Sequence, residues 1–293
     1  MSCENSQHHL RNLYHSGERL RQTGEACSDP QNAIRYAPFT GAPQHVSFPT
    51  EDGGLIFGDL YGQGGRGVVL AHGGRFNKES WENQARQLAT SGFFVLAFDF
   101  RGYGQSRGPG QAQPMNAPLH LDVLAAVRYL HSKGAKTVSV VGGSMGGSAA
   151  GDASIASEPG TIDRLVLLGA APNGPAEKLK SPVLFIVARD DASSAGSRLP
   201  GIRAQYEKAP DPKELIVLDG SAHAQYLFQT DQGERVMREI LRFLSVRSPL
   251  GSGFRACAEI GITYTSGHHF VFVCTGGLRV PSSRGYLRTA PRI

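Results

Sequence analysis

Short continuous apolar runs alternate with segments of helical spacing along the middle of this chain. An apolar run of about four to eight residues is typical of a strand that is buried on both faces of a sheet. Residues 67–71 have this pattern, and further strands are expected at 93–98, 137–141, 164–168, 183–188 and 214–218. Ahead of them, 45–48 and 55–61 flank the turn 51–54, which predicts an antiparallel hairpin.

Helices are expected between the strands, because apolar residues recur there every three or four positions. Trp81, Ala85 and Leu88 have this spacing, and Ser91-Gly92 marks the end of their helix. Further helices are expected at 118–130, 144–156 and 232–244. The buried face of the helix at 118–130 is expected to comprise Leu121, Leu124, Ala125, Val127 and Leu130.

This alternation predicts an α/β protein with a mainly parallel, doubly wound sheet of about eight strands and helices on both faces. Residues 45–248 are expected to form this domain. Residues 1–44 are polar and are interpreted as an N-terminal extension, whereas 249–293 are interpreted as a basic, mobile tail behind the linker 251–253. The short segment 170–181 leaves no room for a lid insertion after the sixth strand.

The composition is that of an ordinary globular protein, with 40% hydrophobic and 19% charged residues among 293. No apolar stretch is long enough to span a bilayer, and the N-terminus lacks the apolar core of a secretory signal, so a cytoplasmic location is expected. Of the net charge of +5, four units lie in 251–293. The domain is therefore not expected to have the concentrated positive charge of a nucleic-acid-binding surface. The oligomeric state stays open.

The cysteines do not indicate a metal site. They are Cys3, Cys27, Cys257 and Cys274. None of them lies within 45–250, and no two have the spacing of metal ligands, so free thiols and no metal are expected.

Gly142-Gly143-Ser144-Met145-Gly146 directly follows the strand at 137–141 and fits the pattern G-x-S-x-G. In this nucleophile elbow a strand turns sharply into a helix and leaves the serine exposed at the tip. The strained turn requires small neighbours, which Gly142 and Gly146 provide. Ser144 is therefore the candidate nucleophile; the alternative is a glycine-rich strand–helix turn with a capping serine.

A serine nucleophile needs a base, and the base needs an acid that orients it. The strand at 183–188 ends in Asp190-Asp191, on the edge of the sheet where Ser144 is expected. We favour Asp191 as the acid and assign Asp190 to the turn, although the choice between them stays open. Of ten histidines, His223 alone follows both Ser144 and the acid within the alternating region, so it is the candidate base.

The oxyanion that forms during acyl transfer needs hydrogen-bond donors. The backbone N–H of Met145, at the start of a helix, is one candidate. The loop His72-Gly73-Gly74 follows the strand at 67–71 and is expected to supply the second, from Gly74. His72 precedes the nucleophile and is interpreted as a structural residue beneath this loop rather than as a second candidate base.

In this order and spacing, the motifs resemble those of the α/β-hydrolase superfamily. The matching segments are 72–74, the D-x-R-G-x-G-x-S loop 99–106, 142–147, 189–191 and 220–223. The resemblance covers 45–245 and is strongest to capless serine esterases and dienelactone-hydrolase-like enzymes. Ser144 stands where dienelactone hydrolases themselves have a cysteine.

The resemblance implies a serine hydrolase that cleaves carboxylic esters through an acyl-enzyme, with Ser144, His223 and Asp191 as the triad. Without a lid, short-chain small-molecule esters are the expected substrates. No metal or organic cofactor and no nucleic-acid partner is implied. Three alternatives stay open: a thioesterase, a peptidase with the same triad, and a hydrolase-fold ligand-binding module with little turnover.

Overall fold

A computed structural model describes residues 38–246. Both the C-terminal tail expected at 249–293 and most of the N-terminal extension expected at 1–44 lie outside the described residues. Phe39, just inside them, packs its ring at 6.1 Å from that of Tyr61. No helix within the described part is long and apolar enough to cross a membrane.

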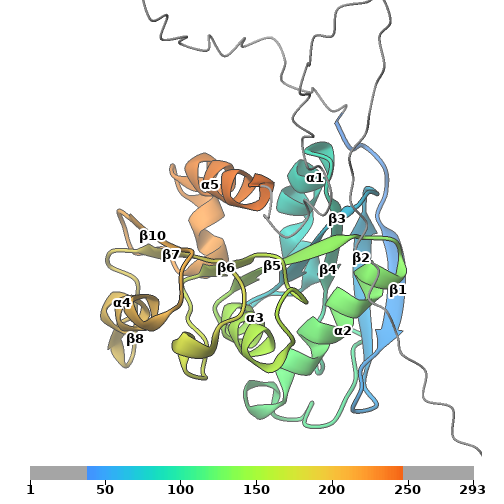
Figure 1. Cartoon of the computed structure of the whole chain (residues 1–293), viewed down its shortest axis with the longest axis horizontal. Helices are drawn as coiled ribbons and strands as arrows, with labels where there is room; N and C mark the ends of the chain where they lie inside the picture. Colours follow the sequence, from blue (N-terminus) through green and yellow to red (C-terminus); the bar gives the residue numbers. More distant parts are fainter. Residues whose placement is uncertain (1–37, 247–293) are drawn as a thin grey trace, which may run out of the picture. The chain divides into compact units, whose positions relative to one another are not determined.

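The predicted sheet of eight mainly parallel strands is confirmed (Figure 1). In spatial order its strands are β1 (Gln44–Pro49), β2 (Leu55–Tyr61), β4 (Phe94–Phe98), β3 (Arg66–Ala71), β5 (Thr137–Gly143), β6 (Leu165–Leu168), β7 (Val183–Ala188) and β10 (Lys213–Leu218). The strands β1 and β2 form the expected antiparallel hairpin, and β2 runs antiparallel to β4. From β4 to β10 all neighbouring strands are parallel.

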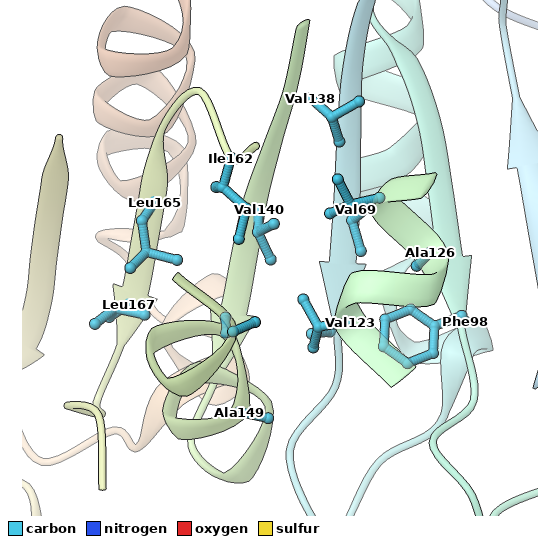
Figure 2. Close-up of a cluster of buried hydrophobic side chains, with 14 of the residues drawn as sticks. Val69, Phe98, Val123, Ala126, Val138, Val140, Ala149, Ile162, Leu165 and Leu167 are labelled. Atoms are coloured by element: carbon cyan, nitrogen blue, oxygen red, sulfur yellow. The ribbon is translucent and has the colours of Figure 1, made fainter. Parts of the chain in front are cut away.

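Helices cover both faces of the sheet (Figure 1). They are α1 (Glu82–Thr90), α2 (Leu119–Ser132), α3 (Met145–Ala156), α4 (Leu199–Lys208) and α5 (Gly233–Ser245). Side chains along β3 alternate between the two faces, as the pleat requires. Val69 packs in the cluster beneath α2 and α3 (Figure 2), whereas Val68 and Leu70 pack in the cluster beneath α1 and α5.

The buried face of α2 differs in part from the prediction. Ala125, Val127 and Leu130 are buried as expected, but Leu121 and Leu124 are only half-buried. The fully buried positions include Asp122 and Val123 instead. An apolar pattern does not anticipate a buried aspartate, and Asp122 is accommodated because a buried arginine pairs with it.

That partner is Arg101, in the 99–106 loop. Its Nη2 donates to Asp122 Oδ1 at 2.6 Å and to Asp52 Oδ1 at 3.0 Å. The hydrogen bonds from Arg101 lower the pKa of Asp52 to about 2, whereas burial raises the pKa of Asp122. The guanidinium thus joins the β1–β2 turn to α2, which is a scaffold role.

One helix was not predicted from the sequence. After β7 come a small hairpin, β8 (Ala192–Ser193) with β9 (Gly196–Ser197), and then α4. The first turn of α4 contains Pro200 and Gly201, and Ile202 is its one buried residue, so its apolar periodicity is weak. The connection from β6 to β7, residues 169–182, contains the single turn η4 (Ala176–Lys178).

The strand order changes direction at β3 and β5. These strands are neighbours, but the chain leaves β3 for α1 on one face and β5 for α3 on the other. A crevice forms where two such connections diverge from the carboxyl ends of parallel strands. The pairing of Ala71 with Gly142 brings the loops after these two strands together.

Candidate active site

Ser144 occupies the junction between the last residue of β5 and the first residue of α3. Its φ of 50° is in the left-handed region. Within residues 38–246, Ala224 is the one other non-glycine residue with a φ in this region. The sharp turn leaves no space for side chains at Gly142 and Gly146. A Cβ atom would lie 2.4 Å from Gly146 O at the first position and 2.3 Å from Ala71 O at the second. The local sequence therefore fits the strained turn that it forms.

Ser144, His223 and Asp191 are brought together from three loops at the carboxyl edge of the sheet. Ser144 Oγ lies 2.8 Å from His223 Nε2, and His223 Nδ1 lies 2.8 Å from Asp191 Oδ2. Because an ionised Asp191 can only accept, Nδ1 carries the proton and Nε2 is left to accept the proton of the serine hydroxyl. This is the tautomer that general-base chemistry at Ser144 requires.

Asp190 does not take part in this arrangement. Asp191 is fully buried, whereas Asp190 is exposed and its backbone N–H donates to Gly220 O at 2.9 Å. The turn after β7 therefore directs one of the two adjacent carboxylates inward and the other into solvent.

Sequence reasoning missed Gly169, the residue after β6. It has a φ of 56°, and a Cβ atom there would lie 3.0 Å from His223 Nδ1 and 3.1 Å from Asp191 Oδ2. Its backbone N–H donates to Ile186 O at 2.8 Å, which holds it against β7. The absence of a side chain at this position allows the imidazole and the carboxylate to meet. In the sequence, the only indication of this role is that a glycine directly follows a strand whose carboxyl end lies at the site.

The loop after β3 is held by hydrogen bonds to nearly every backbone group of Gly73 and Gly74. Gly73 O accepts from Phe76 N and from His72 Nδ1, both at 2.9 Å. Gly74 O accepts from the hydroxyl of Tyr103 at 3.1 Å. Fixing the carbonyl of Gly73 fixes the plane of the Gly73–Gly74 peptide, and with it the direction of the Gly74 N–H. That N–H makes no hydrogen bond within the described residues.

Met145 offers a second N–H group at the adjacent strand end. It is the first residue of α3, and the first N–H groups of an α-helix have no partner within the helix. The two N–H groups proposed as oxyanion donors thus follow the neighbouring strands β3 and β5.

His72 lies beneath the loop, fully buried. Its Nε2 accepts from Phe100 N at 3.2 Å, so Nδ1 carries the proton that is donated to Gly73 O. Burial lowers the pKa of His72 to about 4, which keeps the ring neutral at pH 7. These contacts are structural, as the sequence interpretation expects.

Gln225 is a further residue of the site that sequence reasoning missed. Its side chain is buried between the loop of His223 and the loop after β3. Oε1 accepts from Gly73 N at 2.7 Å, and Nε2 donates to Ser80 Oγ at 2.7 Å. A glutamine two residues after a candidate base gives no signal of this contact, because its partners lie far away in the sequence.

A cleft of about 520 Å³ adjoins the serine. Its lining includes Ser144, Met145, Ser148, Asp152, Asn173, Arg198, Ile202, Gln205 and His120. The lining residues come from α3, from the start of α2 and from α4, the helix that was not predicted. The cleft is large enough for a small organic molecule.

Comparison with known proteins identifies the fold independently. The sequence model of the family described as alpha/beta hydrolase fold matches residues 67–226. This range includes the candidate triad and the candidate oxyanion donors, namely Ser144, His223, Asp191, Met145 and Gly74. A non-heme chloroperoxidase of Streptomyces lividans is 33% identical over 124 residues, covering 42% of this chain and 44% of that protein. The chain spans less than half the length of the first curated relatives that it matches.

Two further proteins are similar to larger parts of the chain. Pimeloyl-[acyl-carrier protein] methyl ester esterase of Cronobacter sakazakii is 28% identical over 193 residues, covering 66% of this chain and 56% of that protein. The structure of an esterase from Pyrococcus furiosus superposes with a TM-score of 0.56 at 22% identity, covering 69% of this chain and 93% of that one. At this identity the structural likeness concerns the fold alone.

Proposed function

Because the chain belongs to the α/β-hydrolase family, we propose that it is a serine hydrolase that cleaves carboxylic esters. In this proposal Ser144 is the nucleophile, His223 the general base and Asp191 the acid that orients it. The observation that carries the proposal is the pair of 2.8 Å contacts that connect Ser144 Oγ, the two ring nitrogens of His223 and Asp191 Oδ2.

Acylation begins when Ser144 Oγ attacks the ester carbon while its proton passes to His223 Nε2. Asp191 stabilises the resulting imidazolium through Nδ1–H. The N–H groups of Met145 and Gly74 donate to the oxyanion of the tetrahedral intermediate. The intermediate collapses, the C–O bond to the alcohol breaks, and the alcohol leaves with the proton from Nε2.

Deacylation repeats these steps with water as the nucleophile. His223 Nε2 accepts a proton from water, whose oxygen attacks the acyl carbon of the Ser144 ester. Collapse of the second intermediate releases the carboxylic acid and returns the proton to Ser144 Oγ. The cycle consumes one ester and one water and yields one acid and one alcohol.

We further propose that the acyl groups are short. The cleft volume of about 520 Å³ and the short connection 169–182 between β6 and β7 support this limit, because little apolar surface is available to cover a long chain. Acyl chains of about two to six carbons are expected to react fastest. The same triad could act on thioesters or amides, and no contact in the cleft favours either over an oxygen ester.

Hydrolysis of p-nitrophenyl esters from acetyl to palmitoyl tests both parts. The wild-type protein should release p-nitrophenol fastest from the short members, and Ser144→Ala should lower kcat by about 10³-fold or more while the thermal midpoint stays unchanged. Absence of turnover in the wild type would favour a ligand-binding module. A maximum at palmitoyl would contradict the proposed chain length.

A further inference from the structure

Arg198, which directly precedes α4, lies beside the carboxylate of Asp191. Its backbone N–H donates to Asp191 O at 2.9 Å, and its Nε lies 3.3 Å from Asp191 Oδ1. Neither Nε nor Oδ1 makes a hydrogen bond, although both atoms are buried. Arg198 and Asp191 thus form an ion pair through Nε and Oδ1 that is not a hydrogen bond.

The hydrogen-bonding capacity of this guanidinium is unused. An arginine side chain carries five N–H donors, and none of those of Arg198 has a hydrogen-bond partner in the part of the chain that the structure describes. The side chain is 36% exposed and lines the cleft beside Ser144. Its outer amino groups are thus available to a molecule in the cleft.

Besides Arg198, the ionisable side chains among the described residues that line the cleft are His120 and Asp152. Among the described residues that line it, Arg198 is the one arginine or lysine and Asp152 is the one carboxylate. Both oxygens of Asp152 already accept hydrogen bonds, from Gly174 N at 2.9 Å and from Asn173 Nδ2 at 2.8 Å. An anion that enters the cleft meets the unfilled donors of Arg198, whereas a cation meets a single carboxylate, each oxygen of which already accepts one hydrogen bond.

We propose that Arg198 determines specificity by binding a carboxylate on the acyl half of the substrate, so that the preferred esters are monoesters of short dicarboxylic acids. This inference rests on the proposed function. The acyl half is assigned because it is the part that stays attached to Ser144, which itself lines the cleft. A guanidinium matches the two oxygens of a carboxylate with two parallel N–H groups, which makes the pairing strong and directional.

Matched pairs of ethyl esters test the proposal. Monoethyl succinate, glutarate and adipate are compared with ethyl butanoate, pentanoate and hexanoate, and acid release is followed in a pH-stat to give kcat/KM. Within each pair the chain length is the same and a carboxylate replaces a methyl group. The wild type should prefer the anionic member of at least one pair by about tenfold or more, the factor that a charge-assisted hydrogen bond supplies.

Arg198→Gln should lower this anionic-to-neutral ratio by about tenfold or more, and Arg198→Lys should give an intermediate ratio. Arg203→Gln is the matched control, because Arg203 is exposed on α4 and does not line the cleft. It removes the same charge five residues farther along the chain and should leave the ratio within about twofold. Equal thermal midpoints verify that the variants are folded.

Four results would overturn the proposal. If Arg198→Gln lowers kcat/KM equally for both members of a pair, Arg198 acts only through Asp191. If ethyl 4-(trimethylammonio)butanoate reacts faster than monoethyl glutarate, the cleft selects cations. If the wild type hydrolyses the neutral esters and not the anionic ones, the substrate class is wrong while the proposed esterase function stands; hydrolysis of neither class contradicts both.

Discussion

The side-chain carbonyl of Gln225 accepts a 2.7 Å hydrogen bond from the backbone N–H of Gly73. This contact connects the loop of the candidate base to the loop of the candidate oxyanion hole. The contact also occupies the N–H of Gly73. The N–H of the next residue, Gly74, makes no hydrogen bond within the described residues and is the proposed donor to the oxyanion. The two loops are thereby fixed relative to each other before any substrate binds.

Replacing Gln225 should impair catalysis more than binding. Gln225→Leu leaves the buried Gly73 N–H without an acceptor and frees the loop, so kcat should fall by about 10- to 100-fold with little change in KM. Gln225→Glu keeps an acceptor for Gly73 and should retain more activity. Steady-state kinetics on a short p-nitrophenyl ester measures both variants. An unchanged kcat in Gln225→Leu would show that the loop holds its geometry without this contact.

The two adjacent aspartates should differ sharply. Asp191→Asn can present an N–H group to His223 Nδ1 and so favour the wrong tautomer, and kcat should fall by about 100-fold or more. Asp190→Asn changes an exposed side chain and should stay within about threefold of the wild type. The ratio of the two kcat values is the decisive quantity. A larger loss in Asp190→Asn would mean that the turn after β7 presents the other carboxylate to His223.

Gly169→Ala should disturb the contact between His223 and Asp191. The added Cβ would lie 3.0 Å from Nδ1 and 3.1 Å from Oδ2, so activity should fall by about tenfold or more. Gly160→Ala is the matched control: its φ of 86° is also left-handed, but no atom lies within 4 Å of the new Cβ. Both variants should lose about 1 kcal/mol of stability from backbone strain. Comparable activity in the two would remove the role assigned to Gly169.

Stability should fall in mild acid because of His72. The unfolded state protonates this ring near its ordinary pKa of 6.5, whereas burial lowers the pKa of the folded state to about 4. Between these values the unfolded state binds more protons, so the free energy of unfolding decreases as the pH falls. The loss amounts to about 3 kcal/mol, at about 1.4 kcal/mol per unit of pKa.

Urea unfolding at pH 7 and at pH 4.5 measures this effect. His72→Asn has no titrating group, so its stability should decline less than that of the wild type over the same interval. The difference between the two declines isolates the contribution of His72 from that of the carboxylates. Equal declines would show that the ring is protonated as easily in the folded protein as in the unfolded chain.

The sheet was predictable because its central strands are buried on both faces, and short continuous apolar runs such as Val183–Ala188 are typical of such strands. The positions of Ser144 and His223 at one edge followed from the parallel alternation. Helix α4 was missed because its early proline and glycine and its single buried residue, Ile202, give a weak pattern. Because α4 was not predicted, the part of the cleft that Arg198 and α4 line was not predicted either.

Contacts between distant segments could not be predicted from local patterns. Gln225 and Gly73 are 152 residues apart, and nothing in either segment specifies the other. The burial of Asp122 on α2 depends on Arg101 in the same way. Such polar pairs are set by the packed structure, because each polar group is buried only where a partner satisfies it.

The most direct test is the identity of the residue that becomes covalently modified. After reaction with a fluorophosphonate probe, peptide mass spectrometry of the wild-type protein should find the adduct on Ser144. Ser144→Ala should stay unlabelled, and His223→Ala should label far more slowly, because the base that activates the hydroxyl is lost. An adduct on another residue, or equal labelling of Ser144→Ala, would contradict Ser144 as the nucleophile.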